Sequence, residues 1–187
     1  MEAKMLEATE KRNTRAAEYA NARDFCRIFD EDMNSLYLLA LLLTGDHEKA
    51  QQSFVAGFED ATNRNTVFKE WARSWARRVI VQNALRAVNP RPPDENTGHL
   101  SASEGAGGEK PEIAAVLELR PFDRFVFVLS VLEGYSNHEC AILLGCTRQD
   151  LLAARTRAFE HIGRAAKFRD VEKLDSPGQA EFQRVYA

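Results

Sequence analysis

Two adjacent polar residues, Arg148 and Gln149, occupy the first turn of an expected helix and could do recognition chemistry there. They follow Thr147, whose hydroxyl can accept from the first free amides of the helix, and precede Asp150, which completes a capping signature. Arginine and glutamine side chains form paired hydrogen bonds with the edges of guanine and adenine. These residue types in this position predict a helix whose amino-terminal turn reads duplex DNA.

The elements around this turn have the spacing of a helix-turn-helix. Another capping signature begins at Ser136, eleven residues before the first, and opens a short helix that ends at Leu144. Gly145 can adopt the left-handed backbone of the turn without steric cost. Ala141 is small where the two helices cross, and Leu151 packs the second helix onto the first. An ordinary helical hairpin without DNA shares this pattern and is the alternative.

A buried helix is expected before this pair of helices. Pro121 suits a first helical turn, an apolar run follows, and Gly134 ends it, so residues 121–133 are expected to form one helix. The helix that begins after Thr147 is expected to run beyond Ile162.

The first half of the chain also has helical periodicity, and no stretch alternates as a strand would. Apolar residues recur at helical spacing over residues 25–44, which are expected to form one helix ended by Gly45. Asp46 can cap the next helix, and residues 67–88 are expected to form a third.

The expected helix at residues 67–88 is basic and carries two tryptophans. Five cations oppose the single acid Glu70: Lys69, Arg73, Arg77, Arg78 and Arg86. Cations meet phosphates and flat rings stack on unpaired bases, so this composition suits single-stranded or melting DNA. The alternative is that Trp71 and Trp75 belong to the core and the arginines form a solvated face.

Length and composition favour packed helical domains. The chain has 187 residues, 44% of them hydrophobic, and a net charge of −3, so nucleic-acid binding would depend on local patches. A segment rich in Pro, Gly, Ser and acids reads as a flexible linker. We expect an all-α chain with a polar extension (1–24), a helical domain (25–88), the linker (89–111), a helix-turn-helix domain (112–166) and a tail (167–187).

Several function classes have no support in the sequence. No arrangement of catalytic residues stands out, so we expect no enzyme and no cofactor. The longest apolar run, residues 36–43, is too short for a membrane span, and no signal peptide is visible, which favours the cytoplasm. The three cysteines (Cys26, Cys140 and Cys146) are expected as buried thiols. Cys140 and Cys146 lie near His138 and His161 in the sequence, but the spacing of these four residues matches no familiar zinc site.

In this order of parts, the chain resembles bacterial RNA polymerase sigma factors of the sigma-70 family, specifically the small two-domain extracytoplasmic-function type. Residues 41–61, LLLTGDHEKAQQSFVAGFEDA, resemble the segment that ends in the polymerase-binding helix. Residues 68–86, FKEWARSWARRVIVQNALR, resemble the helix that engages the −10 element, and residues 119–162 resemble the domain that reads the −35 element. Three residues stand near the family's Trp, Asn and Arg positions: Trp75, Asn83 and Arg86.

The resemblance implies a transcription initiation protein that joins core RNA polymerase and directs it to promoter DNA. It implies −35 contacts through Arg148, Gln149, Leu152, Ala153, Arg155 and Arg157, with the last two holding phosphates. It implies −10 contacts through Arg73, Arg77, Arg78, Asn83 and Arg86, and a polymerase contact through Gln52, Val55 and Phe58. It leaves open an anti-sigma protein as a further partner.

Two segments depart from the family pattern. Gln52-Ser53-Phe54-Val55 replaces the usual Asp-Leu-Val-Gln run, and Leu152-Ala153-Ala154 replaces a Lys-Ser-Arg triplet. Residues 135–164 contain four arginines and three acids, so the net charge of the expected helix-turn-helix is only +1. A second hypothesis is therefore a degenerate sigma-like regulator that binds DNA or another protein without working as a sigma factor.

Overall fold

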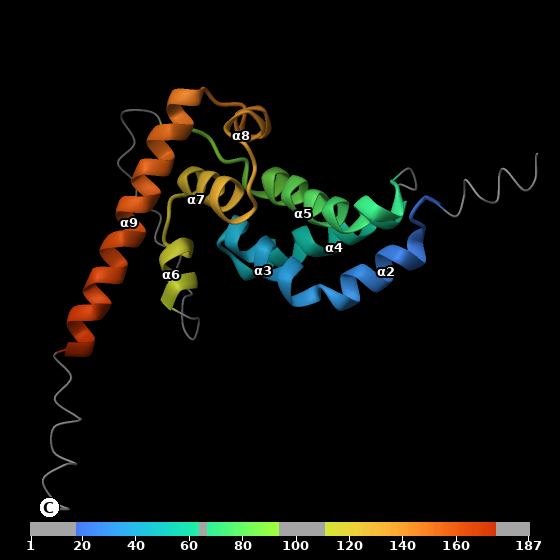
Figure 1. Ribbon diagram of the computed structural model, residues 1–187, viewed down its shortest axis with the longest axis horizontal. Coiled ribbons are helices and arrows are strands. Elements are labelled where there is room, and N and C mark those ends of the chain that lie inside the picture. Colours follow the sequence, from blue (N-terminus) through green and yellow to red (C-terminus); the bar gives the residue numbers. More distant parts are fainter. Residues whose placement is uncertain (1–17, 64–66, 94–110, 175–187) are drawn as a thin grey trace, which may run out of the picture. The chain divides into compact units, whose positions relative to one another are not determined.

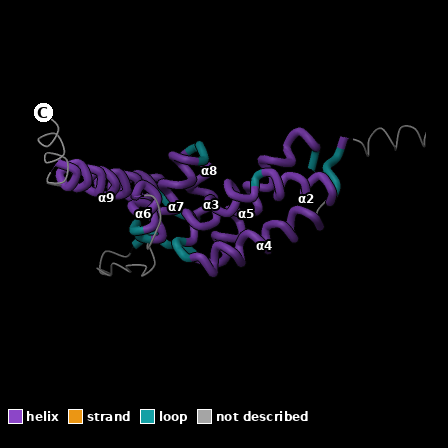
Figure 2. The backbone as a smooth tube through the Cα atoms, turned by 90° about the horizontal axis from the view of Figure 1, so that it is seen from below, coloured by secondary structure: helices purple, strands orange, loops and turns teal. Residues whose placement is uncertain are grey.

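The computed structural model describes residues 18–63, 67–93 and 111–174, and these residues form helices and loops (Figures 1 and 2). Within these ranges the only strand-like pairing is an isolated antiparallel bridge between Tyr19 and Phe68. The prediction of an all-α protein is confirmed. Contacts divide the chain at Pro90 into two compact units, which are described separately below.

In the described part of the first unit, four α-helices pack around an apolar core. They are α2 (Ala22–Glu31), α3 (Met33–Thr44), α4 (His47–Asn63) and α5 (Ala72–Val88), and α3, α4 and α5 contact one another. The largest fully buried side chains include Phe25, Leu36, Leu43 and Ile80. Gly57 lets α4 approach α5 closely, because a Cβ added there would lie 2.7 Å from Cδ1 of Ile80.

The prediction of one helix over residues 25–44 is wrong. The first helix, α2, begins earlier, at Ala22, where the side chain of Asn21 caps it and the carboxylate of Asp24 completes a capping box. It ends at Glu31, and Asp32 leaves helical geometry with φ −103° and ψ 12° before α3 begins. No glycine or proline marks this break, and the apolar periodicity continues across it, which is why the pattern did not reveal it.

The basic segment is also shorter as a helix than expected. Phe68 is extended, Lys69–Trp71 forms a single 3₁₀ turn, and the α-helix α5 starts only at Ala72. It ends at Val88 and is followed by Asn89, whose left-handed backbone has φ 48°. Most of the expected linker and parts of the expected extension and tail lie outside the described residues.

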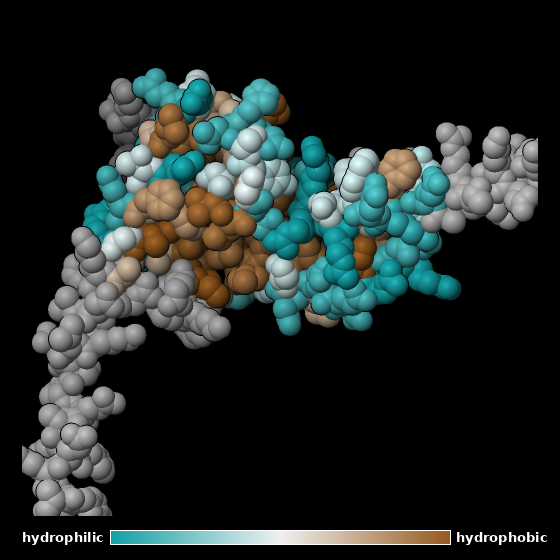
Figure 3. Space-filling view, in the orientation of Figure 1, coloured by the Kyte–Doolittle hydropathy of each residue, from teal (hydrophilic) through white to brown (hydrophobic). Residues whose placement is uncertain are grey.

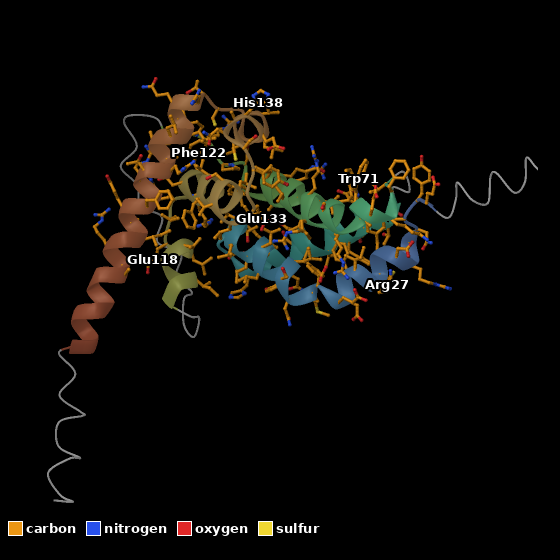
Figure 4. All side chains as sticks on the ribbon, in the orientation of Figure 1. Arg27, Trp71, Glu118, Phe122, Glu133 and His138 are labelled. Atoms are coloured by element: carbon orange, nitrogen blue, oxygen red, sulfur yellow. The ribbon has the colours of Figure 1, made fainter. Side chains whose placement is uncertain are left out.

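The second unit contains α6 (Pro111–Leu117), α7 (Pro121–Phe127), α8 (Asn137–Leu144) and α9 (Arg148–Leu174). The expected helix at residues 121–133 has the predicted extent, but its last turn, Val128–Leu132, widens into a π-helix. There the amide of Glu133 donates to the carbonyl of Val128 at 2.9 Å. Phe122 and Glu133 mark the two ends of this segment in Figure 4. The last helix, α9, continues to Leu174, past the expected domain boundary at residue 166.

A buried arginine joins α6 to α7. The Arg124 side chain donates at 3.0 Å to the carbonyls of both Leu117 and Leu119, where α6 has ended. Burial lowers the pKa of this guanidinium to about 10, so it stays charged at neutral pH.

Among the described residues, no helix is long and apolar enough to cross a bilayer.

Candidate nucleic-acid interface

The turn between α8 and α9 has the geometry that the sequence predicts. The Ser136 hydroxyl accepts from the amide of Glu139 at 3.3 Å, and the Glu139 carboxylate accepts from the amide of Ser136 at 2.9 Å. This capping box opens α8. The helix ends at Leu144, and Gly145 after it has φ 60° and donates its amide to the carbonyl of Ala141. A residue with a side chain would be strained at this φ.

The amino terminus of α9 is capped in the same way. The Asp150 amide donates to the Thr147 hydroxyl at 3.1 Å, and the Asp150 carboxylate accepts from the Thr147 amide at 3.0 Å. The Thr147 hydroxyl also donates to the Asp150 carboxylate at 2.6 Å. The bonds that this hydroxyl and the Thr147 amide donate hold the pKa of Asp150 below its ordinary value of 3.8. The start of α9, and with it the first-turn side chains, is therefore fixed at a defined residue.

The two faces of α9 differ sharply in burial. Leu151, Ala154 and Ala158 are fully buried, and so is Cys140 on α8. The opposite face presents Arg148, Gln149, Leu152 and Ala153 to solvent, with Leu152 45% exposed. All four residues that the sequence predicts for base contact therefore lie together on one exposed surface at the start of α9, which we call the α9 tip. Figure 4 shows His138 at the start of the neighbouring helix α8.

The two arginines expected to hold phosphates have different surroundings. The guanidinium carbon of Arg155 lies 6.0 Å from the ring centroid of Phe159, a cation–π contact on the surface of α9. Arg157 instead binds Asp123 of α7, with Nη2 2.7 Å from Oδ1. Asp123 is almost fully buried and is also held by Arg120. This geometry argues against the predicted phosphate contact of Arg157. The Arg157 side chain instead ties α9 to α7.

The basic face of α5 is largely paired inside the protein. The Arg73 guanidinium donates to Asp32 and Glu31, and these hydrogen bonds raise its pKa above its ordinary value. Arg77 donates to the Ser35 hydroxyl at 3.0 Å. Arg78 is exposed. The five cations of this segment therefore do not form the uniform free surface that the sequence suggested.

Asn83 was expected to face DNA and lies in the core. It is 8% exposed and donates to the carboxylate of Asp60 at 3.0 Å and to the carbonyl of Val79 at 2.9 Å. Arg86 donates to the same Asp60 oxygen at 3.2 Å. Burial and these contacts argue against direct base reading by Asn83, because a buried amide cannot reach a base without opening the unit.

The two tryptophans also differ from each other. Trp71 is 58% exposed and meets Phe68 edge to face, with centroids 5.4 Å apart. Phe68 in turn stacks on Tyr19, with ring centroids 4.6 Å apart. Figure 4 shows Trp71 at the start of α5. Trp75 is half-buried, so the alternative that it belongs to the core fits better than a stacking role.

The residues expected to contact polymerase lie on α4. Gln52 is exposed and donates to the Glu48 carboxylate at 3.3 Å, and Val55 is 48% exposed. Phe58 is half-buried and packs edge to face on Phe29, with centroids 5.2 Å apart. Two of the three predicted residues are thus presented to solvent, while the third supports the core.

The cysteines are unpaired thiols in three different environments. Cys140 is buried as expected, and burial, aided by Glu139, raises its pKa to about 11. Cys146 is half-buried, which raises its pKa as well, and Cys26 is exposed, so neither thiol is fully buried as predicted. Across residues 18–63, 67–93 and 111–174, no group of three His, Cys, Asp or Glu side chains could hold a metal ion.

Three acids that shape these surfaces were missed by sequence reasoning. Asp123 sits in an otherwise apolar run, and its position in the first turn of α7 was the only available signal. Glu31 and Asp32 fall within a stretch that looked like continuous helix.

Comparison with families of known proteins, with curated proteins and with solved structures finds no match to this chain.

Proposed function

We propose that this protein is a sigma-factor-like transcription initiation protein that acts in the cytoplasm. It binds core RNA polymerase and recognises promoter DNA, the −10 element through the first unit and the −35 element through the second. In this proposal α8 and α9 act as a helix-turn-helix, and the α9 tip enters the major groove. The polymerase does the chemistry, and the protein needs no cofactor.

The observation that carries the proposal is the α9 tip itself. A recognition helix needs a fixed first turn, a buried face that anchors it and an exposed face with groups for base edges. The cap at Thr147 supports a fixed first turn. The buried Leu151 and Ala154 support an anchored face. The exposed Arg148 and Gln149 supply groups that can meet base edges. Arg148 suits guanine and Gln149 suits adenine, while Leu152 can touch a thymine methyl group.

The experiment that tests this function is co-purification of core RNA polymerase with the tagged full-length chain. We expect the polymerase to be retained, and Val55→Asp to weaken retention because a charge would replace an exposed apolar contact on α4. Glu59→Gln, a change at another exposed position of α4, is the matched control and should retain polymerase. Failure of the unmodified chain to retain any polymerase would refute the sigma-factor proposal.

A second candidate is favoured by the ion pairs of the first unit. Residues 18–63 and 67–90 hold eight Lys and Arg against ten Asp and Glu, a net charge of −2. Arg73 and Arg86 are paired with carboxylates there. A degenerate sigma-like regulator would keep the helical packing and bind duplex DNA or another protein without engaging a melted promoter. Such a protein would bind through the α9 tip without retaining polymerase.

A further inference from the structure

The break between α2 and α3 places two neighbouring carboxylates on one cation. Successive residues of a continuous α-helix point about 100° apart, so adjacent acids do not normally face the same group. Here Glu31 is the last residue of α2 and Asp32 stands between the helices with φ −103°. The Arg73 guanidinium donates through Nη1 to Asp32 and through Nη2 to Glu31. Asp32 makes no side-chain cap for α3, so its carboxylate serves this pairing.

This pairing covers part of the face of α5 that cations would offer to DNA. One turn further along α5, Arg77 donates to Ser35 of α3, so α3 also holds the next arginine. The Nζ atom of Lys69 lies 3.9 Å from Oδ2 of Asp24 on α2. Figure 3 shows mainly hydrophilic side chains over α2 and the start of α5, as expected for a charged surface of both signs.

We propose that Glu31 and Asp32 form an autoinhibitory contact that occupies Arg73 and competes with nucleic-acid phosphate for it. A phosphate must displace two carboxylates before it can bind this guanidinium, and the neighbouring negative charge opposes its approach. The contact is partly exposed, with the side chains of Arg73, Glu31 and Asp32 at 56%, 45% and 34% of full exposure. It is therefore weak enough to open on binding, as exposed ion pairs are. This inference rests on the proposed DNA-binding function.

The test is a gain of binding in the full-length double variant Glu31→Gln/Asp32→Asn. The probe is a short fluorescent single-stranded oligonucleotide of mixed sequence, titrated at several salt concentrations. We expect the affinity to rise about three- to tenfold, the range that corresponds to releasing two exposed ion pairs. The dependence of log affinity on log salt should steepen by about 0.7, the value for one additional phosphate contact to a single strand.

Two matched variants separate this contact from a general charge effect. Asp30→Asn/Glu59→Gln removes the same number of charges at exposed positions that make no ion pair with α5, and should change affinity much less. Arg73→Gln added to the Glu31→Gln/Asp32→Asn variant should cancel the gain and return the salt slope to that of the unmodified chain. Far-ultraviolet circular dichroism should show the same helical content for all variants.

The outcomes are distinct. If Glu31→Gln/Asp32→Asn binds no better than the Asp30→Asn/Glu59→Gln control, the autoinhibitory contact is refuted. If, in that case, a selected duplex still binds in a manner that depends on Arg148, the proposed function stands without it. If neither the unmodified chain nor any variant binds single-stranded or duplex DNA, both proposals fail together.

Discussion

The carboxylate of Asp123 on α7 binds the guanidinium of Arg157 on α9, with Oδ1 and Nη2 2.7 Å apart. Asp123 is only 3% exposed and also accepts from Nη2 of Arg120 at 2.7 Å. A buried carboxylate is tolerated when charged donors surround it. This ion-paired cluster therefore anchors α9 to α7, and Arg157 lies about two and a half turns beyond Arg148 along α9.

Removing Arg157 should lower stability. Arg157→Ala leaves Asp123 buried with only Arg120 as its charged partner, so we expect a loss of about 1–3 kcal/mol in the free energy of unfolding. Chemical denaturation of the full-length chain measures it. Arg164→Ala is the control, because that exposed side chain donates to the Glu160 carbonyl of its own helix. Unchanged stability with uniformly weaker DNA binding would instead restore the phosphate role that the sequence suggested.

Replacing Gly145 should destabilise the turn between α8 and α9. Gly145→Val forces a β-branched residue to φ 60°, which should cost about 1 kcal/mol or more in the unfolding free energy. The strain is in the backbone alone, because an added Cβ would meet nothing within 4 Å.

The control for that measurement is another glycine with open surroundings. Gly163 lies inside α9 with nothing within 4 Å of an added Cβ, and its φ is not positive. Gly163→Ala should therefore raise stability by about 0.5–1 kcal/mol, because alanine restricts the unfolded chain. Equal effects of the two substitutions on thermal unfolding would show that the turn does not need a left-handed residue.

The sequence predicted those elements whose cause is local. The caps at Ser136 and Thr147 and the left-handed turn at Gly145 follow from side chains that act within three or four residues. The extent of α8 and the burial of Leu151 follow from the same local pattern.

The sequence did not predict features that depend on distant partners. The break at Asp32 is accompanied by ion pairs with Arg73, more than forty residues away, and no local residue marks it. The role of Arg157 depends on Asp123, which lies 34 residues earlier. A helical pattern shows which side chains share a face, but it does not show which charges across the core will meet them.

The cap at Asp150 should make stability depend on pH in the acid range. Its folded-state pKa is lowered by the hydrogen bonds from Thr147, so the cap contributes fully above the ordinary value of 3.8. The contribution is lost as the pH falls through the lower folded-state pKa. Asp150→Ala should therefore be less stable than the unmodified chain near neutral pH, and the difference should shrink below about pH 4. A difference in melting temperature that stays constant to low pH would contradict this assignment.

The most direct test of the central claim is a binding titration of Arg148→Ala on duplex DNA. The duplex is one selected by the full-length protein from a random pool, compared with a scrambled duplex at two salt concentrations. We expect Arg148→Ala to cost about 1–3 kcal/mol on the selected duplex and to relax the preference at one base pair, with little loss on the scrambled one. Arg27→Ala removes one exposed cation from α2 and should leave this preference intact. If Arg148→Ala binds both duplexes as the unmodified chain does, the α9 tip does not read DNA.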